Sequence, residues 1–266
     1  MEVLLFAVAL GGYLVVALGR VPGGSPRPRW VERVCDGALW LAVIAHLGGL
    51  GLLVARTGRP PVTTPGASLA SLSAVIALGN IGLRRLPRGG PLEGLVAALS
   101  VALLGLGLIL PNDVGPPTAA SGLWFPLHAA MIFLGLGGFA LSFGASVLFL
   151  VVRRRLKLKR LDGLARLPSL DALDQLNTRL IVLGFLALTA GIGAGGLWAA
   201  SLGEHTEALG PTVYISRMLW GWYAAAILLR GVGGWRGRLA AHFSLVGFTG
   251  LLVGLGATLL WTRGWH

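Results

Sequence analysis

Long apolar runs recur from one end of the 266-residue chain to the other. Most are about 17–25 residues long, which is the length that an α-helix needs to cross the hydrocarbon core of a bilayer. Only 12% of the residues are charged, about half of the share that is usual in soluble domains. We therefore predict an all-α integral membrane protein, a single polytopic domain of residues 1–266 with about eight transmembrane helices. The predicted spans are approximately residues 3–19, 37–55, 68–83, 93–110, 125–152, 179–202, 214–229 and 239–261.

The basic residues predict the orientation of these spans. Of the 22 Lys and Arg residues, 18 fall in the first, third, fifth and seventh connections and four in the others. Short connections rich in Lys and Arg stay in the cytoplasm, so both termini are predicted on the outer (periplasmic or extracellular) side. We expect a multi-pass protein of the bacterial plasma (inner) membrane. The net charge of +12 is explained by the bilayer as partner, and no nucleic acid is expected.

Several kinds of chemistry are excluded by composition. Cys35 is the only cysteine, so an intramolecular disulfide, a CxxC redox pair and a thiolate metal cluster cannot form. The sequence has no catalytic triad or phosphate-binding loop, and we do not expect it to be an enzyme on its own. The first apolar run starts at Glu2 with no basic stretch before it, so we expect a retained span rather than a cleaved signal peptide.

Histidine is the most informative residue type in this chain. Neutral imidazole coordinates transition metals and haem iron through a ring nitrogen. The predicted topology places His128, His205 and His266 on the outer side, His46 near the middle of the second span and His242 near the inner end of the last. The outer three are also compatible with ordinary interface, loop and tail positions. His46 is harder to explain as structural, because ionisable groups at mid-bilayer are rare and usually functional.

Two local patterns predict features of the helices. Gly138, Ser142 and Ser146 repeat at four-residue spacing, which favours close packing of a neighbouring helix over contact with a planar cofactor. The run Pro168-Ser169-Leu170-Asp171 predicts a helix start, with the acids Asp171 and Asp174 in its first turns. We interpret the segment after it as an amphipathic lead into the sixth span.

A set of residues in the second half of the chain carries a family resemblance. These residues are Leu127-His128, Trp198-Ala199, Trp220, Tyr223, Arg230, Gly234-Trp235-Arg236-Gly237, Gly247-Phe248 and His266. From about Trp124 onwards the chain resembles the cytochrome c assembly family of haem-handling membrane proteins, the CcsA and CcmC type, and most closely its HemX-like branch. The family's outer loop is rich in tryptophan and ends in Trp-Asp-Pro-Lys-Glu. Here residues 204–211 contain His205 and Pro211 but no tryptophan, so the loop is degenerate.

The resemblance implies a haem-binding protein that holds or delivers b-type, non-covalent haem at the outer face for cytochrome c assembly. His128 and His266 would be the two axial ligands of the iron. His46, perhaps with His242, would form an inner site, and His205 would be a polar contact of the altered loop. Aromatic packing around the haem would come from Trp124, Trp198 and Trp220. A second assembly protein and apocytochrome c are the partners that such a function implies.

Two other functions fit the same sequence. A HemX-type membrane regulator would lower the level of glutamyl-tRNA reductase in haem biosynthesis, and its working surface would be the cytoplasmic connections such as residues 153–179. A non-haem membrane scaffold subunit would have kept the fold after losing the tryptophan-rich loop. The outer histidines would be dispensable in the regulator.

Overall fold

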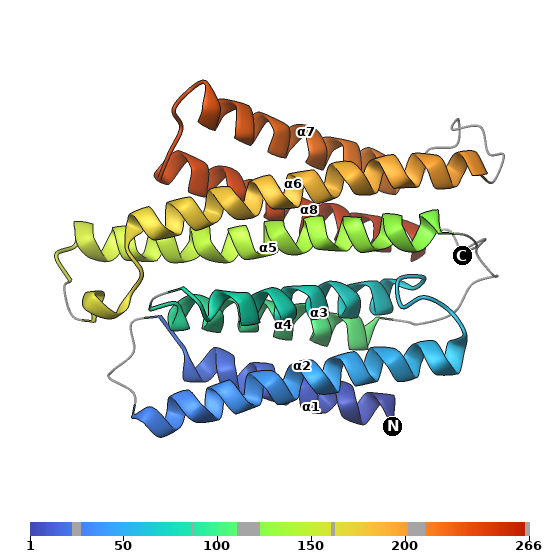
Figure 1. Ribbon diagram of the computed structural model, residues 1–266, viewed down its shortest axis with the longest axis horizontal. Helices are drawn as coiled ribbons and strands as arrows, with labels where there is room; N and C mark the ends of the chain where they lie inside the picture. Colours follow the sequence, from blue (N-terminus) through green and yellow to red (C-terminus); the bar gives the residue numbers. More distant parts are fainter. Residues whose placement is uncertain (23–27, 87, 111–122, 161–162, 202–210, 264–266) are drawn as a thin grey trace. The chain divides into compact units, whose positions relative to one another are not determined.

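The chain folds into a series of long α-helices (Figure 1). The computed structural model describes residues 1–22, 28–86, 88–110, 123–160, 163–201 and 211–263, with the backbone alone for residues 211–212 and 257–263. No β-strand occurs in these ranges. The elements are α1 (Glu2–Gly19), α2 (Arg29–Thr57), α3 (Pro65–Leu83), α4 (Gly90–Ile109), α5 (Trp124–Lys157), the short 3-10 helix η1 (Leu164–Arg166), α6 (Leu170–Ser201), α7 (Pro211–Gly231) and α8 (Arg238–Arg263).

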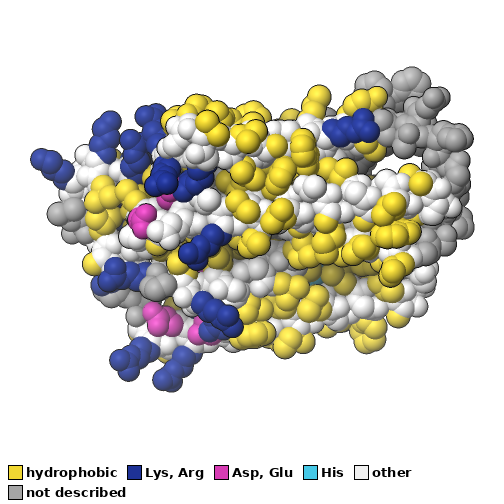
Figure 2. All heavy atoms as spheres, turned by 45° about the horizontal axis from the view of Figure 1, so that its top comes forward, with side chains coloured by type: hydrophobic (Ala, Val, Ile, Leu, Met, Phe, Trp, Pro, Cys, Tyr) yellow, Lys and Arg dark blue, Asp and Glu magenta, His cyan; other side chains and the backbone are white. Residues whose placement is uncertain are grey.

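The predicted all-α integral membrane fold is confirmed. Within the described part of the chain, seven helices are long and apolar enough to cross a membrane, namely α1 to α6 and α8. The remaining helix, α7, is less apolar because Tyr214, Ser216 and Arg217 interrupt it. Many large side chains, such as Ile44 at 65% exposure, face outward from the bundle. Figure 2 shows hydrophobic side chains over the flanks of the helices and Lys and Arg side chains near their ends.

The helix ends follow local sequence signals. Thr64 caps α3 by accepting a hydrogen bond from the amide of Ala67 at 3.2 Å, and the proline that follows Thr64 suits the first helical position. Gly58 ends α2 in the left-handed conformation, with φ of 65°. Ser169 caps α6 by accepting a hydrogen bond from the amide of Ala172 at 3.1 Å. The predicted helix start therefore exists, and it opens α6 directly.

The first compact unit, unit 1, consists of Met1–Pro116 and Leu148–Leu173. In it, α1 packs against α2 and α4, and α3 packs against α4 and α2. The axes of α1 and α2 are close because Gly12 has no side chain. A Cβ atom at Gly12 would lie 2.7 Å from Cβ of Ala42. Tyr13 and Leu39 are fully buried in the apolar core between these helices.

The second compact unit, unit 2, consists of Pro117–Val147 and Asp174–His266. In unit 2, the first part of α5 lies directly against α6. A Cβ atom at Gly138 would lie 3.0 Å from Cα of Gly184. One turn further along α5, Ser142 donates a hydrogen bond to Oδ1 of Asn177 at 2.6 Å. Ser146 donates to the same oxygen at 3.2 Å. The strip of small residues is thus a helix-packing surface, as predicted.

A charged contact joins three segments of unit 2 at the start of α6. Arg230 of α7 donates two hydrogen bonds to the carboxylate of Asp174, at 3.1 and 2.7 Å. The amide of Gly237, just before α8, donates to the same carboxylate at 2.9 Å. We call this contact the Asp174 clamp. Paired and bidentate bonds of this kind are stronger than neutral hydrogen bonds.

Candidate functional site

His128 lies in the second turn of α5, in unit 2, and its ring packs on α6. Its Nδ1 atom is 2.7 Å from the carbonyl oxygen of Gly191. A carbonyl oxygen only accepts hydrogen bonds, so Nδ1 carries the proton and donates it to Gly191. The neutral ring then keeps a lone pair on Nε2. A histidine that is fixed through Nδ1 in this way is oriented as metal-binding histidines usually are.

The ring of His128 has an aromatic side chain on one side and, on the other, the backbone of α6 at a glycine. The indole of Trp198 stacks against the imidazole, with ring centroids 6.3 Å apart and planes 23° apart. Phe125 packs on the same indole at 4.9 Å. A Cβ atom at Gly195 would lie 2.6 Å from Nδ1, so the ring is close to α6 only because this residue is glycine. The structure thus brings together two predicted residues, His128 and Trp198.

The sequence prediction did not include Gly191 and Gly195, which position His128. The signal was present in the sequence, because two glycines four residues apart form a flat strip on one face of a helix. That strip marks where another helix can approach, and His128 is the side chain that occupies it. Phe125, the second residue of α5, was likewise left out of the predicted aromatic set.

The other two predicted tryptophans lie elsewhere in unit 2. Trp124 is the first residue of α5 and is 39% exposed. Trp220 of α7 donates its Nε1 hydrogen to the hydroxyl of Thr189 at 3.0 Å and packs on Phe185 at 5.4 Å. Trp220 therefore joins α7 to α6 at Phe185 and Thr189, the nearer of which is nine residues before Trp198.

His46 lies in unit 1 and is fully buried between α1, α2 and α3. Its Nδ1 atom is 3.1 Å from the hydroxyl of Tyr13. Phe6 contacts the imidazole edge-on, with centroids 5.7 Å apart. The backbone of Ala70 in α3 is the other polar group beside the ring, and among the described residues no atom meets ordinary hydrogen-bond geometry with Nε2. His46 is thus enclosed by protein and does not face lipid.

His242 is an exposed residue in the second turn of α8. Its Nδ1 atom is 2.7 Å from the carbonyl oxygen of Arg238, four residues earlier in the same helix. His46 belongs to unit 1 and His242 to unit 2. His205 and His266, the remaining two predicted residues, lie outside the described residues. Among the residues that are described, no group of three or more His, Cys, Asp or Glu side chains is arranged to hold a metal ion.

Comparisons with known proteins identify similar chains. The model of the cytochrome c assembly protein family matches residues 67–266. A cytochrome c biogenesis protein CcsA from Prochlorococcus marinus strain MIT 9312 is 26% identical over 224 residues, which is 74% of this chain and 72% of the relative. The protein of the same name from strain MIT 9515 is 27% identical over 183 residues, 61% of this chain and 58% of the relative. The CcsA of Gloeobacter violaceus is 36% identical over 91 residues, 34% of this chain and 27% of the relative.

Proposed function

Because the chain belongs to the cytochrome c assembly family, we propose that it acts in cytochrome c biogenesis by binding b-type haem at the outer face of the membrane. In this function it holds or delivers haem, and apocytochrome c and a second assembly protein are its partners. The relatives that carry the name cytochrome c biogenesis protein support the role. The observation that supports the haem site best is the fixed imidazole of His128.

The residues around His128 suit a haem ligand. The hydrogen bond to Gly191 holds Nδ1, so Nε2 is the atom that would bind iron. Trp198 stacks on the imidazole and Phe125 packs on Trp198, so these two residues supply apolar aromatic surface beside the ring, as a porphyrin edge requires. His266 is proposed as the second axial ligand, on the basis of the family resemblance alone. Haem bound by two imidazoles would have no open iron position for oxygen chemistry.

The outer location of this site is supported by charge. The basic residues that mark the cytoplasmic side include Arg153 to Arg155, which lie at the carboxyl end of α5. His128 is at the opposite end of α5 from these arginines, so the positive-inside rule assigns it to the outer side. Arg217, in the half of α7 next to the outer loop, would be available to pair with a haem propionate.

His46 is proposed as a second, weaker haem contact on the inner part of the path. Its burial at a depth where titratable groups are rare supports a functional use. The ring is already held by Tyr13 and enclosed by Phe6. Haem would therefore reach Nε2 of His46 only after α1 and α3 move away from the ring.

Replacing His128 by alanine is expected to reduce the haem content of the purified protein at least about tenfold, because the oriented nitrogen ligand is removed. The measurement is the ratio of Soret to protein absorbance after expression with added haem. Thr178→Ala is the control, since it removes a side chain of unit 2 whose hydroxyl donates to the carbonyl oxygen of Asp174 in its own helix, and its haem content should equal that of the wild type. Adding imidazole to His128→Ala should restore part of the Soret band.

An unchanged Soret band in His128→Ala would remove this residue from the site. A cellular test then separates the function from its alternatives. Cells that lack the gene should lose c-type cytochromes on a haem-stained gel, and the His128→Ala gene should fail to restore them. Normal cytochromes together with a raised glutamyl-tRNA reductase level would instead identify a regulator of haem synthesis.

A further inference from the structure

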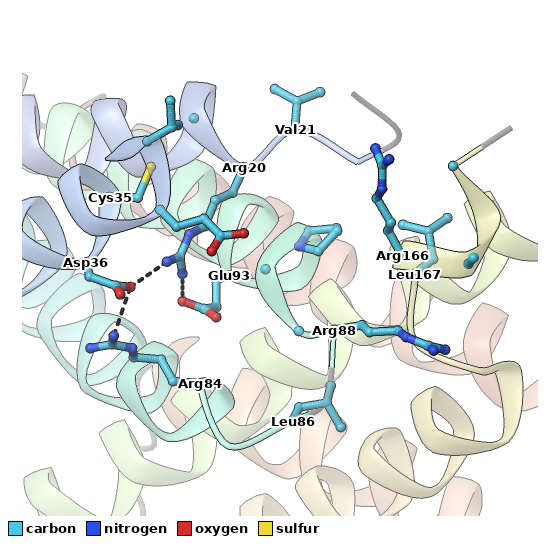
Figure 3. A pocket seen from close by; sticks show the side chains of 18 residues that line it. Arg20, Val21, Cys35, Asp36, Arg84, Leu86, Arg88, Glu93, Arg166 and Leu167 are labelled. Atoms are coloured by element: carbon cyan, nitrogen blue, oxygen red, sulfur yellow. Dashed lines mark hydrogen bonds and ion pairs between the residues drawn. The ribbon is translucent and has the colours of Figure 1, made fainter. Parts of the chain in front are cut away.

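Unit 1 contains a cavity of about 460 Å³ at one end of its helices. The cavity lies among the end of α1, the first turns of α2, the α3–α4 connection and the η1 turn (Figure 3). All the connections that meet there are ones that the basic residues assign to the cytoplasm. Its volume is in the range of small-molecule sites, and nothing in the proposed haem chemistry uses it.

One wall of the cavity is an ion-pair network with no net charge. Arg20 is 8% exposed and pairs with both Glu93 and Asp36. Arg84 pairs with Asp36 at 2.8 Å. Two guanidinium groups thus face two carboxylates, as the dashed lines in Figure 3 show. The charged groups of this wall are paired with one another, so they offer little free charge to a ligand.

The opposite wall contains two cations that have no partner among the described residues. Arg88 and Arg166 line the cavity and both are exposed. Neither forms an ion pair or side-chain hydrogen bond in the described part of the chain. Figure 3 shows them on the side away from the network, on two different segments of chain. The amino end of α4, at Gly89 and Gly90, lines the same space, and the amino end of a helix attracts negative charge.

We propose that this cavity binds a phosphate group, either that of a membrane lipid headgroup or free phosphate. A phosphate has enough acceptor oxygens for two guanidinium groups and a helix amino end at once. Basic pockets on the cytoplasmic side of membrane bundles are suited to lipid headgroups. Glu32, an exposed carboxylate of the same lining, would accept a hydrogen bond from an ammonium or hydroxyl group attached to the phosphate. The site lies in unit 1, and its test needs no haem.

The test measures binding of four probes to the full-length protein in a phosphate-free maltoside detergent. The probes are dioctanoyl phosphatidylglycerol, dioctanoyl phosphatidylethanolamine, inorganic phosphate, and dioctanoylglycerol, which has the same acyl chains without phosphate. Each is titrated against the wild type, against Arg88→Gln/Arg166→Gln, and against Arg85→Gln/Arg160→Gln. The last variant is the matched control, because it removes two exposed arginines from the same two connections that do not line the cavity.

Wild type and control should bind the phosphate-bearing probes equally, and the cavity variant should bind them at least about tenfold more weakly. Binding of the two phospholipids identifies a headgroup as the source, and binding of inorganic phosphate alone identifies the free anion. Equal affinity in the cavity and control variants, or equally tight binding of dioctanoylglycerol, would overturn the proposal. Should the cavity variant fail to fold, the wild-type titrations decide, since a wild type that binds none of the phosphate probes has no such site.

Discussion

Replacing Arg20 by methionine is expected to lower the free energy of unfolding by about 3–5 kcal/mol. Arg20 is the partner of Glu93, which is 5% exposed. Without the guanidinium, this carboxylate is buried with no opposite charge, and burial of an unpaired charge is costly. Asp36 loses less, because it is more exposed and keeps its pair with Arg84. The measurement is reversible denaturation of the protein in detergent micelles.

A double variant distinguishes two contributions to the free energy of unfolding. One is the cost of leaving Glu93 buried without a partner, and the other is the net contribution of the ion pair. Arg20→Met/Glu93→Met removes both charges, and most of the lost stability should return, because an apolar pair of similar volume commonly replaces a buried ion pair at little cost. Arg56→Met is the control, since Arg56 pairs with Glu2 but is 71% exposed. Exposed pairs contribute about 0–1 kcal/mol. A single variant Arg20→Met as stable as Arg56→Met would contradict the expected burial of Glu93.

The second large effect concerns the contact between α5 and α6. Gly138→Leu is expected to lower the free energy of unfolding by about 1–3 kcal/mol or more, as overpacking does. A Cβ atom at Gly138 would lie 3.0 Å from Cα of Gly184 and 3.1 Å from the carbonyl oxygen of Leu180. Both are backbone atoms, so no side-chain rotation relieves the overlap and the helices must separate. Denaturation in micelles measures the change.

Gly193→Leu is the matched control for this substitution. Gly193 is an exposed residue of α6 with nothing within 4 Å of its added Cβ position, so leucine there should leave stability unchanged within about 0.5 kcal/mol. Separation of α5 from α6 should also weaken the bond from His128 to Gly191, and Gly138→Leu should therefore retain less haem than Gly193→Leu. Equal stability of the two variants would show that the helices do not touch at Gly138.

The order and number of the helices were predictable because each apolar run ends in proline, glycine or a basic cluster. The start of α2 was not: α2 begins at Arg29, eight residues before its predicted span. α6 begins at Leu170, nine residues before its predicted span, at the helix start that Pro168-Ser169-Leu170-Asp171 predicted. Hydropathy detects the part of a helix that contacts lipid, whereas these first turns are polar. They are held by tertiary pairs, such as Asp36 with Arg20 and Asp174 with Arg230.

The candidate site was predictable only in part. His128 and Trp198 came from a family resemblance. Their rings stack in unit 2, and their role in haem binding stays a prediction. Gly191 and Gly195 mark a place on α6 where another helix can approach, but the sequence does not indicate that the carbonyl oxygen of Gly191 bonds to His128. The pair of Arg20 and Glu93 spans 73 positions, and the bond of Tyr13 to His46 spans 33. No periodicity within one helix can indicate contacts between residues this far apart in the sequence.

The Asp174 clamp holds the helices of unit 2 together at one end of α6. One carboxylate fastens α6 to the last turn of α7 and to the residue before α8, and at 1.5 Å per residue it is about 25 Å along α6 from Gly191. At the end of α6 that contains Asp174, Ser142 and Ser146 of α5 bond to Asn177 of α6. Helices that are bonded to one another at one end separate more easily at the other end. We therefore expect α5 and α6 to separate more readily beside Trp198 than beside Asp174.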